Sequence, residues 1–136
     1  LKGDLTPIQG RLMYKVSRRF TLSCSHRLYD REKTEEENRA IFGKCMNEHG
    51  HNFRIEITLH GYVLKNGMLF NFSDLKDVFM KNVHEKYDHK SLNDVMENIP
   101  TAENLATEIF NIIARYFPVE SVKVWETDDC FAEISQ

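Results

Sequence analysis

Two stretches of alternating apolar and polar residues restrict what this chain can fold into more than any other feature. From Phe53 to Leu59 every odd position is Phe, Ile or Leu, and the even positions carry Arg, Glu and Thr. The stretch from Leu12 to Cys24 alternates similarly, with mainly apolar residues at even positions. Because successive side chains of a strand point to opposite faces, each stretch predicts a strand that buries one face. We therefore expect two long strands, over residues 12–24 and 51–63, in a sheet with one face in the core.

Three shorter segments are predicted to add strands. Lys65-Asn66-Gly67 favours a tight turn, because an Asn-Gly pair tolerates positive φ. The next residues, Met68–Phe72, are then expected to return as a third strand that forms a hairpin with residues 51–63. Val122 and Val124 alternate with polar residues and predict a fourth strand, and Phe131–Ile134 predicts a short fifth strand.

Apolar residues at helical spacing indicate two main helices. Ser73 is a good N-cap for a helix of about three turns that continues to Val83. Thr101 is expected to cap a second helix, which must end before Pro118 because proline cannot continue it. A minor helix is predicted over Thr34–Phe42, where the first and fourth residues have the spacing of a capping box.

The order of these elements predicts the fold class. The strands do not alternate regularly with the helices, which favours an antiparallel sheet with the two main helices packed on one face. The chain has no internal repeat, low-complexity tract or Pro/Gly-rich linker. We therefore expect one α+β domain over residues 1–136.

Composition argues against two classes of partner. The formal net charge of −3 provides no basic surface for nucleic acid, and no apolar run approaches the roughly 20 residues that span a membrane.

The three cysteines lack disulfide spacing and fit a reducing compartment, so a cytoplasmic location is expected. The chain begins at Leu1, so residues 1 to about 12 are expected to be a leader or a cloning remnant, with Met13 as a candidate native start.

Three histidines form a candidate metal site. His49 and His51 share one face at the start of the second strand, and His26 continues the apolar face of the first strand. If these strands pair antiparallel, the three imidazoles meet at one end of the sheet. Three imidazoles suit zinc and leave a fourth position open, as in catalytic sites. Two other readings exist: His49 and His51 are a chance surface pair, or Cys45 is a fourth ligand that closes a structural site.

Other polar residues have both functional and structural readings. Glu126 is an even-numbered residue like Val122 and Val124, so its side chain is expected on the buried face of the strand. A buried carboxylate needs a partner, which is either a ligand or an internal salt bridge; the remaining alternative is that the strand edge is exposed. Asp88 and His89 are either a catalytic pair or a solvated loop. Thr101 and Glu103 lie at a helix start, where capping and compensation of the helix dipole are sufficient explanations.

Several short motifs occur in a fixed order. They are Ser25-His26-Arg27-Leu28, Glu36-Glu37-Asn38, Phe42-Gly43-Lys44-Cys45, His49-Gly50-His51-Asn52, Asp88-His89, Thr101-Ala102-Glu103-Asn104 and Val124-Trp125-Glu126-Thr127-Asp128. From about Val16 to the C-terminus, the chain resembles the 6-pyruvoyl-tetrahydropterin synthase family. Several chemically distinct motifs in order make this resemblance far more specific than the pair of histidines alone.

The resemblance implies a fold, an assembly and a reaction. The fold would be the tunnelling fold (T-fold), in which three subunits join their four-stranded sheets into a barrel and two trimers stack into a homohexamer. The reaction would convert 7,8-dihydroneopterin triphosphate into 6-pyruvoyl-tetrahydropterin with loss of triphosphate, on the route to tetrahydrobiopterin. Zinc is the implied cofactor, and Mg²⁺ is expected to accompany the substrate triphosphate.

The resemblance also implies roles for individual residues. The three histidines would bind zinc, and Cys45 would be the base that abstracts a proton. Asp88 and His89 match the proton-relay pair of the family, and Glu126 matches its pterin anchor. Glu103 belongs to the region that the family places in the pterin pocket, next to the capping residue Thr101.

Two alternative functions follow from the same residues. Cys45 and His49 are four residues apart, as in the related enzymes of queuosine biosynthesis, so the main alternative is a 6-carboxy-tetrahydropterin synthase. The segment of residues 34–42, by contrast, resembles the pyruvoyl enzymes. The second alternative is a non-catalytic, zinc-stabilised assembly module. Retention of the implied catalytic and pterin-binding residues argues against a scaffold, which has no need for them.

Overall fold

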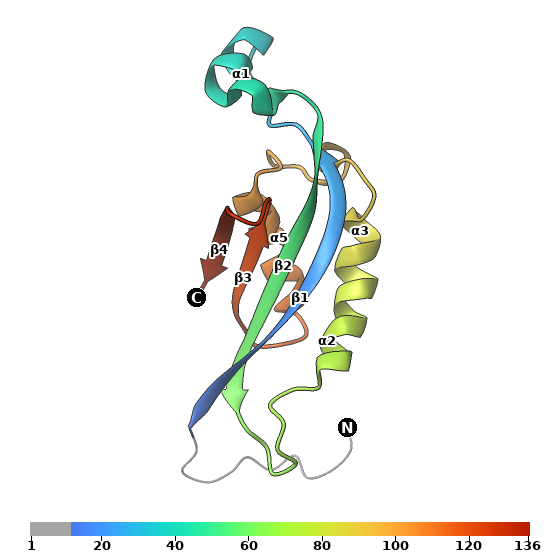
Figure 1. Ribbon diagram of the computed structural model, residues 1–136, viewed down its shortest axis with the longest axis vertical. Coiled ribbons are helices and arrows are strands. Elements are labelled where there is room, and N and C mark those ends of the chain that lie inside the picture. Colours follow the sequence, from blue (N-terminus) through green and yellow to red (C-terminus); the bar gives the residue numbers. More distant parts are fainter. Residues whose placement is uncertain (1–11) are drawn as a thin grey trace.

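The two alternating stretches form the longest strands of a four-stranded antiparallel sheet. The computed structural model describes residues 12–136, so the prediction for the leader lies, up to residue 11, outside the described residues. Strands β1 (Met13–His26) and β2 (His49–Tyr62) pair side by side. They are followed in the sheet by β3 (Val119–Trp125) and β4 (Phe131–Ser135), in the spatial order β1-β2-β3-β4 (Figure 1).

The strand register leaves one end of the sheet only two strands wide. β1 and β2 pair along their whole length, from Met13 opposite Tyr62 to His26 opposite His49. β3 pairs with β2 only from Arg54 to Leu59. The last residues of β1 and the first residues of β2 therefore extend beyond β3 as a two-stranded ribbon (Figure 1).

The predicted third strand at Met68–Phe72 is wrong, although the turn before it is correct. Gly67 has a φ of 87°, and the Leu64 N–H donates to the Met68 carbonyl oxygen at 3.0 Å. The residues that follow are bends that lead into a helix, with Leu69 buried close to Gly61. No hairpin with β2 forms, because the end of β2 is bonded elsewhere: β1 pairs along one edge, and on the other edge the His60 N–H donates to the Pro118 carbonyl oxygen at 3.2 Å.

The first main helix is irregular. α2 (Phe72–Phe79) begins at Asn71, whose side chain accepts the Ser73 N–H, so the predicted cap at Ser73 is displaced by two residues. It continues as a π-helical turn, η2 (Met80–His84), and a short α3 (Glu85–Tyr87).

The other two predicted helices begin where the sequence predicted. In α5 (Ala102–Ile113) the Thr101 hydroxyl accepts the Asn104 N–H at 3.1 Å. The expected capping box of Thr34 and Glu37 opens α1 (Glu35–Phe42). The remaining helical segments are the short 3₁₀ turn η1 (Gly43–Met46) and α4 (Leu92–Val95).

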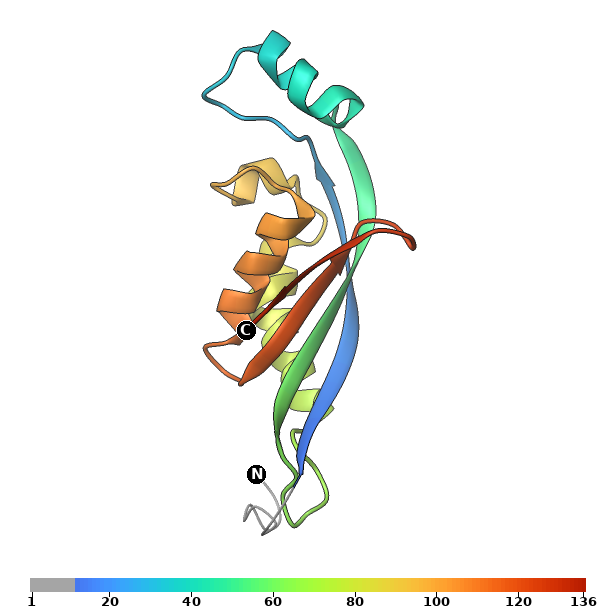
Figure 2. The ribbon, with the colours of Figure 1, turned by 90° about the vertical axis from the view of Figure 1, so that its left-hand side faces the viewer.

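The core lies between the sheet and the helices that cover one of its faces (Figure 2). Phe53, Ile55, Ile57 and Leu59 are all fully buried on this face of β2. Phe20 of β1 stacks on Phe79 of α2 with ring centroids 4.0 Å apart. The arrangement confirms the α+β prediction, with two main helical segments on one face of the sheet. Within residues 12–136, no helix has the length and apolar character needed to cross a membrane.

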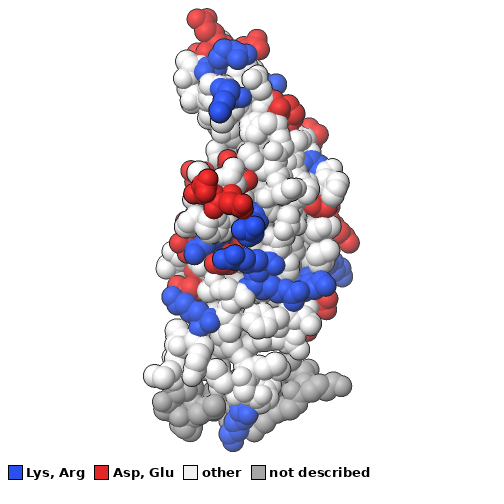
Figure 3. All heavy atoms as spheres, in the orientation of Figure 1, with Lys and Arg blue, Asp and Glu red and all other residues white. Residues whose placement is uncertain are grey.

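The opposite face of the sheet is polar and faces the viewer in Figure 1. Arg19 donates from Nε to Oε1 of Glu56 at 2.7 Å, and Lys123 lies 3.5 Å from the other oxygen of this carboxylate. Figure 3 shows a band of Lys and Arg side chains across this face with acidic side chains among them. The positive charges are thus partly neutralised by neighbouring carboxylates, which fits the slightly negative net charge.

Candidate active site

The three predicted histidines meet at the two-stranded end of the sheet. His26 lies opposite His49 in the register, and His51 lies opposite Cys24. The three ring centroids are 4.5 to 5.2 Å apart, and one ligand atom of each ring lies within 4.8 Å of the others. The parity argument is therefore confirmed: the three histidines are positioned to bind one metal ion.

Backbone carbonyls orient two of these imidazoles. The Nδ1 atoms of His26 and His49 lie 2.7 Å from the carbonyl oxygens of Pro100 and Asn47, respectively. Because a carbonyl oxygen only accepts, Nδ1 carries the proton and Nε2 keeps its lone pair. The buried Nε2 atoms of His26 and His51 have no hydrogen-bond partner among the described residues. This arrangement fits a metal, since metal-binding histidines typically donate their other ring nitrogen to a carbonyl or carboxylate.

Burial keeps His26 in the form that binds metals. Only 1% of the residue is exposed, and burial is the main cause that lowers the pKa of His26. The Pro100 carbonyl and Glu126 oppose this shift, while His49 and His51 reinforce it. The neutral imidazole is the metal ligand, so the local environment favours binding.

Cys45 lies next to the histidine trio but is not part of it. It belongs to the 3₁₀ turn after α1, and the Leu28 N–H donates to the Cys45 carbonyl oxygen at 2.8 Å. Among residues 12–136, the group of close ligand atoms consists of the three histidines alone. Cys45 instead lines a hollow of about 400 Å³ together with His49, His51 and Glu126. Cys45 thus shares a hollow with His49 and His51 without belonging to the group of close ligand atoms.

Glu126 lies directly after β3, on the histidine side of the sheet. Its carboxylate oxygen Oε2 is 3.8 Å from Nε2 of His51, and its side chain is 32% exposed. Its N–H donates to the Cys130 carbonyl oxygen at 3.1 Å, which closes the turn into β4. Glu126 also lines a second hollow of about 210 Å³, which Glu103 borders from the start of α5. The carboxylate therefore lies where the two hollows meet.

Thr101 and Glu103 occupy different positions. The Thr101 hydroxyl is engaged as the N-cap of α5, as the structural reading predicted. Glu103, two residues later, faces the smaller hollow beside Glu126.

His89, which is bonded to Asp88, borders a different hollow. The Nδ1–H of His89 donates to Asp88 Oδ2 at 2.6 Å, and the His89 side chain is 80% exposed. His89 borders a hollow of about 460 Å³ that His51 and Cys24 also line. Within one chain, the structure thus does not bring Asp88 and His89 into the hollow of Cys45 and Glu126.

The backbone at His89 is strained and held in place by β1. His89 has a φ of 59°, in the left-handed region that residues other than glycine rarely adopt. Its N–H donates to the Ser23 carbonyl oxygen at 2.6 Å, and the Ser23 N–H donates to Asp88 Oδ1 at 2.9 Å. These bonds fix the pair against the outer edge of β1.

Comparisons with known proteins give the same assignment as the motifs. A family model described as "6-pyruvoyl tetrahydropterin synthase" matches residues 15–136. The 6-pyruvoyl tetrahydrobiopterin synthase of Homo sapiens is 40% identical over 129 residues, which cover 88% of this chain and 89% of the human protein. A putative 6-carboxy-5,6,7,8-tetrahydropterin synthase of Archaeoglobus fulgidus is 44% identical over 92 residues, covering 67% of this chain and 78% of the archaeal protein.

A solved structure extends the match to three dimensions. The 6-pyruvoyl tetrahydropterin synthase of Caenorhabditis elegans superposes with a TM-score of 0.86 at 27% identity, covering 93% of this chain and 97% of the nematode chain. This match confirms the T-fold of the subunit. With the family match over nearly the whole chain, it leads to one conclusion: the chain belongs to the 6-pyruvoyl tetrahydropterin synthase family of enzymes.

Proposed function

We propose that the protein is a zinc-dependent 6-pyruvoyl-tetrahydropterin synthase. It would convert 7,8-dihydroneopterin triphosphate into 6-pyruvoyl-tetrahydropterin with elimination of triphosphate, in tetrahydrobiopterin biosynthesis. The observation that carries the proposal is that metal-binding histidines, a thiol and a carboxylate line one hollow. These groups match three needs of the reaction: polarising the substrate side chain, removing a proton from it and holding the pterin ring.

Zinc is the metal that the histidine trio suits best. Three neutral imidazoles are typical zinc ligands, and three protein ligands leave one coordination position for the substrate. When bound, zinc would supply a Lewis acid that polarises the side-chain oxygens of the substrate. Mg²⁺ is proposed to accompany the triphosphate, because hard phosphate oxygens are its preferred ligands.

Cys45 is proposed to remove a proton from the substrate side chain. The thiolate is the reactive form of cysteine, and nearby cations favour it. Lys44 borders the same hollow as Cys45, together with His49 and His51, two of the three histidines that would hold the cation. The side chain of a bound substrate would therefore lie between the thiol and the open position of the metal.

Glu126 is proposed to hold the pterin ring. The aminopyrimidinone edge of a pterin presents two parallel N–H donors, which one carboxylate accepts as a bidentate pair. Its place between the two hollows would direct the ring toward Glu103 and the substrate side chain toward Cys45. Thr101 would contribute to this pocket indirectly, by fixing the start of the helix that carries Glu103.

Asp88 and His89 are proposed to relay protons. Asp88 accepts the Nδ1–H of His89, which leaves Nε2 of this exposed ring free to accept and return a substrate proton. Since Cys45 lines a different hollow of the same chain, we propose that a neighbouring copy completes the site in a homohexamer built as a dimer of trimers. β1 and β4 are the edge strands of the sheet and would pair between subunits. Light scattering of the purified protein measures the number of subunits directly.

A cytoplasmic location is also proposed. The cysteines, Cys24, Cys45 and Cys130, are free thiols, which fits a reducing compartment. Fractionation of cells that express the protein tests this location.

The second candidate function is 6-carboxy-tetrahydropterin synthesis. It is favoured by the identity of 44% to the archaeal protein that carries this name. One experiment separates the two: the zinc-loaded protein is incubated with 7,8-dihydroneopterin triphosphate, and the pterin product is identified by mass spectrometry. A pyruvoyl product supports the main proposal, a carboxy product supports the second, and absence of turnover leaves only the non-catalytic assembly module.

A further inference from the structure

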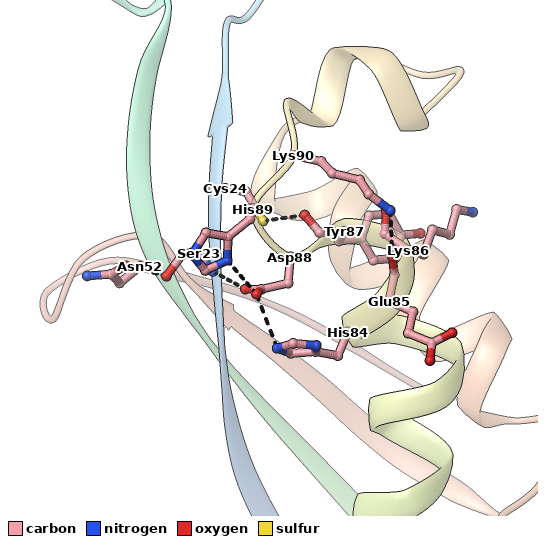
Figure 4. A network of polar contacts seen from close by, with 10 residues as sticks. All are labelled: Ser23, Cys24, Asn52, His84, Glu85, Lys86, Tyr87, Asp88, His89 and Lys90. Carbon is pink, nitrogen blue, oxygen red and sulfur yellow. Dashed lines mark hydrogen bonds and ion pairs between the residues drawn. The ribbon is translucent and has the colours of Figure 1, made fainter.

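The Asp88 carboxylate accepts two hydrogen bonds and also contacts a second imidazole as an ion pair. Oδ1 accepts the Ser23 N–H at 2.9 Å. Oδ2 lies 2.6 Å from Nδ1 of His89 and 3.2 Å from Nε2 of His84. Figure 4 shows the two rings converging on this oxygen from different segments, His84 from the helix and His89 from the loop after it. His84 therefore joins Asp88 and His89, the pair that the proposed function uses, as a third member of one polar network.

The helix geometry explains why His84 reaches Asp88. The two residues bracket α3 at the i, i+4 spacing that places side chains on one helix face, and the Asp88 N–H donates to the His84 carbonyl oxygen at 2.9 Å. The π-helical turn just before α3 contains one residue more than an α-helical turn, with the Glu85 N–H donating to the Met80 carbonyl oxygen. One extra residue rotates the positions that follow by about 100°, so this turn determines which face His84 occupies.

The shared carboxylate couples the two imidazoles. Burial opposes ionisation of Asp88, but hydrogen bonds from Ser23 and His89 and the charges of His84 and His89 together lower the pKa of Asp88. The carboxylate is therefore ionised near neutral pH and carries one negative charge for two rings. The two rings contact the same carboxylate oxygen, so positive charge on one ring would oppose positive charge on the other.

The other polar groups around this network bind other partners and compete little for the Asp88 carboxylate. The thiol of Cys24 in β1 points to the Tyr87 carbonyl oxygen, and burial, reinforced by Asp88, raises the pKa of Cys24 to about 12. The ammonium group of Lys90 is turned to the carbonyl oxygens of Glu85 and Lys86 (Figure 4). Among the further titratable side chains on the adjoining elements, Tyr87 of α3 donates its hydroxyl to Glu108. Glu85 and Lys86 also lie in α3, and His51 of β2 lines the same hollow as His89.

We propose that His84 is a positioning residue of the reaction: it orients the Asp88 carboxylate and shares its charge with His89, and so sets the pH range in which His89 exchanges protons. The inference rests on the proposed relay role of Asp88 and His89. Through Asp88, His84 would act on the proton-transfer step without touching the substrate.

Two substitutions separate orientation from charge. His84→Gln keeps an N–H donor near the Nε2 position but removes the ionisable ring, and His84→Leu removes both. In both variants the acidic limb of the pH profile of kcat/KM is expected to move to higher pH by about half a unit, as for a partly exposed charge pair. At pH 8, kcat is expected to stay within about twofold in His84→Gln and to fall roughly threefold to tenfold in His84→Leu, because only His84→Leu loses the polar contact with Asp88 Oδ2.

A titration of the imidazoles tests the coupling without turnover. In protein labelled with ¹³C at the histidine Cε1 positions, NMR measures the titration midpoint of His89, which both variants should move to higher pH. The matched control is His60→Leu, because His60 faces Glu120 at 3.3 Å with 28% of its side chain exposed, against 34% for His84. This variant should leave the midpoint and the pH profile unchanged.

The outcomes distinguish this inference from the proposed function. A His89 midpoint that stays in place in both His84 variants overturns the inference even if the wild-type protein turns over dihydroneopterin triphosphate. A shifted midpoint in a protein without this activity supports the coupling and rejects the proposed function. An equal loss of kcat in both variants without any movement of the pH profile would show a purely structural role and also overturn the inference.

Discussion

Replacing Glu126 by glutamine removes one negative charge and exchanges one of two acceptor oxygens for an amide donor. If the carboxylate accepts two pterin N–H groups, the variant loses one charge-assisted hydrogen bond, worth about 1.5–3 kcal/mol. The new amide N–H then faces a pterin N–H, and these two unpaired donors cost a further amount of about 1–3 kcal/mol. The side chain is 32% exposed, so water compensates for part of this loss. We therefore take the lower end, about 2.5 kcal/mol, which corresponds to a roughly 60-fold decrease in kcat/KM.

The assay measures kcat/KM for 7,8-dihydroneopterin triphosphate together with the zinc content of each sample. Zinc content is expected to stay unchanged, because Glu126 lies outside the histidine trio. Glu133→Gln is the matched control: the same chemical change on β4, at an exposed residue that pairs with Lys123 and lies on the outer face. If Glu126→Gln lowers kcat/KM by no more than about threefold relative to this control, the proposed anchor is wrong.

Three further substitutions test the site and the core. Cys45→Ala should retain zinc and lower turnover by about 10²–10⁴-fold, as expected for loss of a general base; loss of zinc in this variant would instead support a closed structural site. His49→Ala should lower zinc content, measured by mass spectrometry of the metal, and turnover together, and a fully loaded variant would contradict its role as a ligand. Phe79→Ala removes a fully buried ring stacked on Phe20 and should lower the free energy of unfolding in urea by about 3–5 kcal/mol, whereas a change below about 1 kcal/mol would contradict the packing.

Local patterns in the sequence were sufficient for most of the fold. The alternation located β1 and β2 to within two residues at each end, because burial of one face is encoded in the strand itself. Caps located α1 and α5, because their hydrogen bonds join residues three apart. The strand expected at Met68–Phe72 failed because its absence depends on Pro118, which lies about 50 residues further along the chain and accepts the His60 N–H at the end of β2.

The candidate site was predictable only in part. Strand parity brought the three histidines together, and the family resemblance singled out Cys45 and Glu126. The Asn47 and Pro100 carbonyls that orient the imidazoles have no side-chain signature. His84 and Asp88 have the i, i+4 spacing of a contact on one helix face. This spacing predicts the contact only if a helix is known to run between the two residues and the π-helical turn before them is known.

The two-stranded ribbon that carries the histidines has a consequence for how the protein responds to loss of its metal. Isolated two-stranded ribbons are marginally stable, and although Leu22, Cys24 and Phe53 at the base of the ribbon belong to the main core, its tip lies beyond β3. Local opening of the tip should therefore require less free energy than global unfolding. A chelator is expected to accelerate amide hydrogen exchange at residues 25–26 and 49–51 while residues 54–59 stay protected. The metal would therefore stabilise one end of a protein that is already folded. In a zinc finger, by contrast, the chain folds only when the metal is bound.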